Sequence, residues 1–191
     1  MKLWKSLLVG FGTYVVLTFG MNMLILGLAG TLGAYFASGI STIILTTFTG
    51  VEGFAPVGLE LYGAFGSWIG YFQIDTVMSN IQGVVALLAP IIPGLTAAIL
   101  AGKLGRSSKN GFFGMLLTGI IVSVVPIVML FIEPLIVLAY TPTILAAFTL
   151  ITVPWVAAII TSGWFVAILL GVYGILIGLF WGGLAAFFGR E

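Results

Sequence analysis

The sequence has neither cysteine nor histidine among its 191 residues. Without histidine there is no imidazole to act as a general base or to bind a metal. Without cysteine there is no thiolate nucleophile, no disulfide and no iron–sulfur ligand. Phosphate-binding loops, nucleophile elbows and zinc motifs are absent as well. The sequence therefore predicts a protein that is not an enzyme and that holds no metal and no cofactor.

Charge is equally scarce, because only 6% of the residues are charged, whereas a soluble domain carries roughly 25%. Hydrophobic residues make up 61% of the chain. So few ionised groups cannot cover the surface of a soluble protein, and they cannot neutralise a nucleic acid. The composition excludes soluble, disordered and nucleic-acid-binding proteins and predicts a protein embedded in a lipid bilayer.

Four apolar stretches are long enough to cross a membrane as helices, which takes about 20 residues each. They are Ser6–Leu28, Gln82–Gly102, Gly111–Ile132 and Trp155–Phe188. The sequence thus predicts an all-α fold, a polytopic helical membrane bundle with four full spans. We expect one membrane domain, 1–191, with two loosely similar halves, 1–102 and 103–191.

Two further apolar segments, Ala29–Phe48 and Pro134–Val153, are interpreted from the positions of the charges. Basic loops are retained on the cytoplasmic side of a membrane. With four spans, all six basic residues fall on that side together with both termini, and four of the five acidic residues fall on the other. We therefore expect a multi-pass protein of the cell membrane in which both segments re-enter the bilayer or lie in its outer interface. Six spans, with Leu61–Phe72 as an extra crossing, is the alternative.

Small residues recur at four-residue spacing on two of the predicted spans. This spacing leaves a groove along one helix face, where another backbone can approach closely. The predicted helix-packing positions are Gly94, Ala98 and Gly102 in the second span and Gly163, Ala167, Gly171, Gly174, Gly178 and Gly182 in the fourth. Such faces pack either within the chain's own bundle or against another subunit, and the sequence leaves both interpretations open.

Prolines interrupt the second span at Pro90 and Pro93, just before Gly94. Each proline removes a backbone donor, so this helix is predicted to kink or break, and Pro126 is predicted to bend the third span. Broken helices expose backbone carbonyls to ions and substrates in transporters. The candidate permeation residues are Pro90, Pro93 and three carboxylates near the predicted outer mouth, Glu52, Glu60 and Glu133.

Two functional hypotheses follow. The first is a structural or accessory subunit of a membrane assembly, with the lipid bilayer, further copies of itself or other membrane subunits as partners. It is based on the lack of reactive side chains and on the small-residue helix faces. The alternative is a small channel or permease for an ion or solute, with a broken helix at Pro90–Gly94.

Overall fold

The structure is a computed structural model that describes residues 2–28, 30–37, 40–49, 85, 88–89, 91–132 and 162–190. Several predictions from the sequence fall outside these described residues. They concern Pro90, Glu52, Glu60, Glu133 and the segments Leu61–Phe72 and Pro134–Val153.

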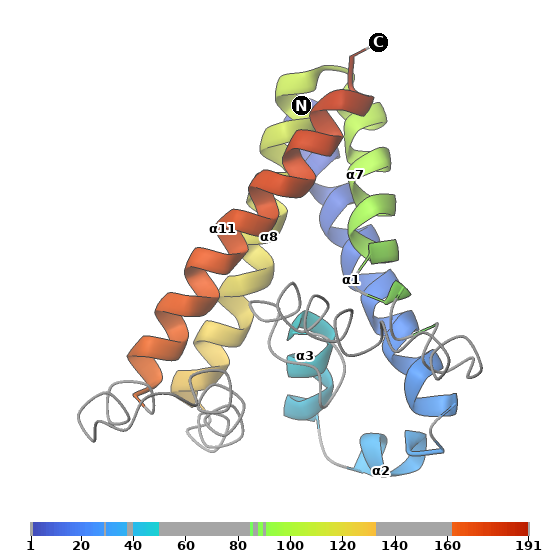
Figure 1. The fold of residues 1–191 in the computed structure, drawn as a ribbon, viewed down its shortest axis with the longest axis vertical. Coiled ribbons are helices and arrows are strands. Elements are labelled where there is room, and N and C mark those ends of the chain that lie inside the picture. Colours follow the sequence, from blue (N-terminus) through green and yellow to red (C-terminus); the bar gives the residue numbers. More distant parts are fainter. Residues whose placement is uncertain are drawn as a thin grey trace, which may run out of the picture.

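The regular structure of the described residues is α-helical, as the sequence predicts. The helices are α1 (Lys2–Leu28), α2 (Leu32–Ala37), α3 (Ile40–Thr49), α7 (Ile91–Gly105), α8 (Ser108–Ile132) and α11 (Gly163–Phe188) (Figure 1). Three of them, α1, α8 and α11, are long and apolar enough to cross a membrane, and α7 is a shorter apolar helix. The protein is a multi-pass helical membrane protein, and three of its four predicted spans correspond to these long helices.

The four larger helices form two pairs, α1 with α7 and α8 with α11. The pairs lie close together at one end of the molecule and diverge toward the other (Figure 1). Helix α3 lies between them on the diverging side, where it contacts both α1 and α8. The N-terminus, the C-terminus and the α7–α8 loop all lie at the end where the pairs meet (Figure 1). We call this the closed end.

Helix is the conformation that lipid imposes on such sequences, because every backbone polar group must be hydrogen-bonded without help from water. The ends of α11 are satisfied locally. Ser162 accepts a hydrogen bond from the Phe165 N–H at 3.3 Å and so caps the first turn. The Gly189 N–H donates to the Ala185 carbonyl at 3.0 Å at the other end.

Within the predicted second span, helix α7 begins at Ile91, directly after Pro90. Among the described residues before it, the Ala89 N–H donates to the Val85 carbonyl at 2.9 Å, as in a helical turn. Pro93 lies in the first turn of α7, where backbone N–H groups have no acceptor within the helix, so its missing N–H is tolerated. With 15 residues, α7 is about 22 Å long, against about 30 Å for the bilayer core.

The segment Ala29–Phe48 contains two short helices in place of one long one. Helix α2 has 6 residues and α3 has 10, so neither alone reaches the length of a span. Tyr35 of α2 is only 2% exposed, and its hydroxyl donates to the Ile43 carbonyl of α3 at 3.4 Å. Its ring packs with Ile25 and Leu26 of α1, which ties the short helices to the first span.

Candidate functional site: the glycine-lined helix interfaces

The most extensive contact among the described helices joins α8 to α11, and glycine determines its geometry. A Cβ atom built at Gly178 would lie 2.8 Å from the Leu116 carbonyl oxygen, and one at Gly182 would lie 2.9 Å from that of Phe112. Both distances are shorter than real Cβ contacts, and the atoms met belong to the backbone. The two helix backbones are therefore in direct contact along this line.

The glycines of α8 are equally close to the backbone of α11. A Cβ atom at Gly119 would lie 2.7 Å from the Cα atom of Gly178, so glycine faces glycine across the interface. One turn further along, Gly174 lies against the Ser123 side chain. The Ser123 hydroxyl donates to the Ile120 carbonyl at 2.9 Å, so its polar group is satisfied within its own helix.

Helix α7 brings its small residues to α11 in the same way. Gly102 lies against the Ala185 carbonyl, and Gly94 lies beneath the indole ring of Trp181, with no room for a Cβ atom at either glycine. Ala98 between them is fully buried. The predicted small-residue faces of the two helices therefore meet each other inside the chain's own bundle.

The remaining predicted packing positions make looser contacts. Gly171 would place a Cβ atom 3.9 Å from the Ile127 side chain, an ordinary van der Waals distance. Ala167 is 8% exposed, and Gly163 is the half-buried first residue of α11. The close contacts are thus concentrated between Gly174 and Gly182, toward the closed end.

Sequence reasoning missed several positions that take part in these interfaces. They are Gly10 of α1, and Gly111, Gly114 and Gly119 of α8. A signal was present, because Ser6 and Gly10, Gly114 and Thr118, and Gly119 and Ser123 are small residues spaced by four. Serine and threonine count as small residues in membrane helices, and including them would have identified α1 and α8 as packing partners.

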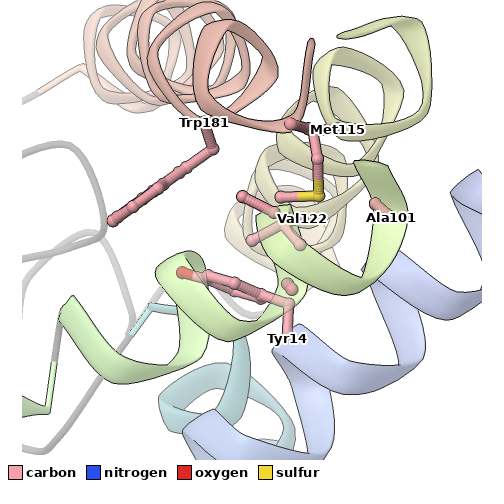
Figure 2. Packing of buried hydrophobic residues seen from close by; sticks show 8 residues of the cluster. Tyr14, Ala101, Met115, Val122 and Trp181 are labelled. Atoms are coloured by element: carbon pink, nitrogen blue, oxygen red, sulfur yellow. The ribbon is translucent and has the colours of Figure 1, made fainter. Parts of the chain in front are cut away.

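A compact core forms where the two helix pairs meet (Figure 2). Tyr14 comes from α1, Ala101 from α7, Met115 and Val122 from α8, and Trp181 from α11, all of them at most 8% exposed. Four of these residues, all but Ala101, line a cavity of about 10 Å³ together with Thr118, Gly119 and Ile177. That space is roughly enough for one water molecule, so it cannot hold an organic substrate.

Three helices are joined at the closed end by Ser6, which is fully buried. Its hydroxyl donates to the Ala101 carbonyl of α7 at 2.9 Å, and its side chain lies against Gly114 of α8. One turn further along α1, Gly10 would place a Cβ atom 2.9 Å from the Met115 sulfur. The small residues of α1 therefore allow α7 and α8 to approach it together.

A line of polar side chains continues along the same buried face of α1. We call Ser6, Tyr14, Thr18 and Asn22 the polar stripe, because multiples of four residues separate them and all four are buried. The Thr18 hydroxyl is buried without a hydrogen-bond partner. An unpaired buried hydroxyl is costly, since it has lost its hydrogen bonds to water without replacement.

No group of three or more metal-ligating side chains occurs in the part of the chain that the structure describes. Of the candidate permeation residues, Pro93 alone lies in that part, buried in the first turn of α7. The interfaces between helices are thus the best-defined candidate site.

No protein-family model, no curated protein and no solved structure matches this chain. Its assignment to the multi-pass helical membrane proteins is based on its composition and on the three long apolar helices.

Proposed function

We propose that this protein is a non-enzymatic structural or accessory subunit of a membrane assembly. The observation that supports this most is the use of the buried hydroxyl groups. Ser6 donates to the Ala101 carbonyl, Thr118 to the Gly114 carbonyl at 2.9 Å, and Ser123 to the Ile120 carbonyl. A hydroxyl that donates to a helix carbonyl already uses its proton within the bundle, and the Ser6 bond also links α1 to α7.

In this proposal the partner contacts a surface other than the small-residue faces, because Gly94, Gly102 and Gly174–Gly182 already contact helices of the same chain. Helix α11 offers a second, outward face of large apolar residues. It includes Trp164, Ile168, Val172, Ile175 and Leu179, all of them at least 43% exposed. Large side chains on one face can interdigitate with those of a neighbouring helix, so this outward face is the proposed partner surface.

The absence of cysteine provides a direct test by cross-linking. Ile168 on the outward face is 62% exposed, whereas its neighbour Ala167 is 8% exposed. In membranes we expect Ile168→Cys to form a disulfide-linked dimer on mild oxidation, and Ala167→Cys, the matched control, to remain monomeric. The unmodified chain, extracted with its surrounding lipid by an amphipathic polymer, should have the mass of more than one subunit. A strictly monomeric particle without a cross-link at Ile168 would contradict the proposal.

A small channel or permease is the second candidate, and the polar stripe of α1 favours it. Polar side chains in membrane helices face either the bundle interior or a solute path. The unpaired Thr18 hydroxyl is a group that a passing solute or water molecule could use.

A flux assay in proteoliposomes separates the two candidates. If the stripe conducts, Thr18→Val should reduce flux of a small ion or solute several-fold while the protein stays folded. Thr13→Val, on the same helix but half-buried, serves as the control. If the stripe is structural, wild-type vesicles should show no flux, and Thr18→Val should raise the melting temperature because it removes an unpaired buried hydroxyl.

A further inference from the structure

All six basic residues of the chain are described, and all six are exposed at the closed end. We call Lys2, Lys5, Lys103, Arg106, Lys109 and Arg190 the basic cap. They come from four segments that are distant in sequence: the first turns of α1, the last turn of α7, the α7–α8 loop with the start of α8, and the residue after Gly189. None of the five acidic residues lies in the described part of the chain, although Glu191 follows Arg190 directly.

Hydrogen bonds fix the backbone of the α7–α8 loop at the centre of the cap. The Asn110 side-chain amide donates to the Gly105 carbonyl at 3.1 Å, and the Asn110 N–H donates to the Ser107 hydroxyl at 3.2 Å. Arg106, which lies between Gly105 and Ser107, has a backbone φ of 50°, in the left-handed region that residues other than glycine rarely adopt. Its N–H donates to the Lys103 carbonyl at 3.3 Å. Lys103, Arg106 and Lys109 are thus carried on an ordered turn and on the helix ends that flank it.

The end of α11 packs onto the same turn. A Cβ atom at Gly189 would lie 3.0 Å from the Ser107 carbonyl oxygen and 3.2 Å from that of Gly102. A Cβ atom would be tight against these carbonyl groups, so glycine favours this approach, which brings Arg190 next to the loop that carries Arg106. Cations more than 80 positions apart in the sequence are therefore held together on one surface.

Large aromatic side chains flank the cap. Trp4 is 66% exposed beside Lys5, Phe113 is 50% exposed one turn after Lys109, and Phe187 is 62% exposed. The Arg190 guanidinium carbon lies 5.9 Å from the centre of the Phe187 ring. Exposed aromatic rings beside exposed cations are typical of the depth at which lipid headgroups lie.

We propose that the basic cap is a binding surface for anionic phospholipid headgroups. Cations held together on one surface repel one another, and a phosphate anion relieves that repulsion. The ordered loop lowers the conformational entropy lost on binding. A lipid is the ligand that fits, since the flanking aromatic rings contact acyl chains and glycerol while the cations contact phosphate. A free phosphate ion would use the cations alone.

Native mass spectrometry of the full chain in detergent tests this proposal. The protein is titrated with phosphatidylglycerol or with phosphatidylcholine of identical acyl chains. We expect preferential phosphatidylglycerol adducts that weaken as salt rises. The triple variant K103Q/R106Q/K109Q should lose affinity by up to about five-fold per removed cation, which corresponds to ~1 kcal/mol for each Lys or Arg near a lipid surface.

A charge-preserving triple variant, K103R/R106K/K109R, is the matched control and should keep the preference. Arg190→Gln alters only an exposed side chain beyond the last helix, so it reports on the cap even if the triple variant fails to fold. Equal binding of both lipids by the wild type would overturn the proposal. So would an unchanged preference in Arg190→Gln and the triple glutamine variant, or adducts formed with inorganic phosphate but not with phosphatidylglycerol.

Discussion

Replacing Gly178 by valine is expected to separate α8 from α11 and to lower the free energy of unfolding by about 3 kcal/mol, at the upper end of the usual range for overpacked sites. A Cβ atom at this position would lie 2.8 Å from the Leu116 carbonyl oxygen and 3.1 Å from the Leu116 Cα atom. Backbone atoms cannot move aside as a flexible side chain can. The whole helix must shift instead, and with it the contact between Gly178 and Gly119.

Gly183→Val is the matched control, because Gly183 lies on the same helix and nothing lies within 4 Å of a Cβ atom built there. Valine has a higher helix propensity than glycine, so this variant should be at least as stable as the wild type. Unfolding in mixed micelles, followed by circular dichroism as denaturing detergent is added, measures both changes. Equal stability of the two variants would show that the α8–α11 backbones are not in contact in the folded protein.

Gly114→Ala is expected to destabilise the closed end by about 2 kcal/mol, again by overpacking. The added methyl group meets the Ser6 side chain, and Ser6 cannot rotate freely because its hydroxyl donates to the Ala101 carbonyl. The change therefore disturbs the contacts among α1, α7 and α8 at one point. A lower melting temperature with unchanged helix content is the expected observation.

A compensating substitution makes this second prediction specific. Ser6→Gly alone should lower the free energy of unfolding by about 1 kcal/mol, since it removes the hydrogen bond to the Ala101 carbonyl. In the double variant, however, the space left by the serine side chain accommodates the new methyl group. Ser6→Gly/Gly114→Ala should then be more stable than the sum of the single changes predicts, by a coupling energy of about 1 kcal/mol. Strict additivity would contradict the packing of Ser6 against Gly114.

The helical membrane class and the long helices could be predicted from the sequence because few backbone conformations satisfy their hydrogen bonds within a lipid bilayer. An apolar run of sufficient length must satisfy its own backbone, so Ser6–Leu28 and Gly111–Ile132 lie within the observed α1 and α8. Whether an apolar run forms a spanning helix depends on its own hydropathy and length, and not on the other segments that it packs against. Likewise, the basic residues were expected on one side of the membrane, and the structure places all six at one end of the bundle. Which side of the membrane that end faces stays a prediction.

The sequence was less informative wherever the outcome depends on two segments at once. Spacing by four indicates a groove at Gly94, but not that the large ring of Trp181 fills it from another helix. The segment Ala29–Phe48 contains α2 and α3, and the Tyr35 hydroxyl of α2 donates to the Ile43 carbonyl of α3, a contact that hydropathy does not register. The effect of proline is local, and the sequence predicts an interruption at Pro90 and Pro93. Helix α7 begins at Ile91 with Pro93 in its first turn, where proline is tolerated.

The position of Trp181 and Ala185 has a consequence for how the chain is assembled during synthesis. Both residues belong to α11, yet they pack with Tyr14 of α1 and Ala101 of α7, two helices that precede α11 in the chain, in one buried cluster. The parts of α1 and α7 that this cluster covers therefore stay uncovered until α11 has been inserted beside them. A nascent chain without α11 would present these surfaces to chaperones and membrane proteases, so insertion of α11 is the step that completes the core.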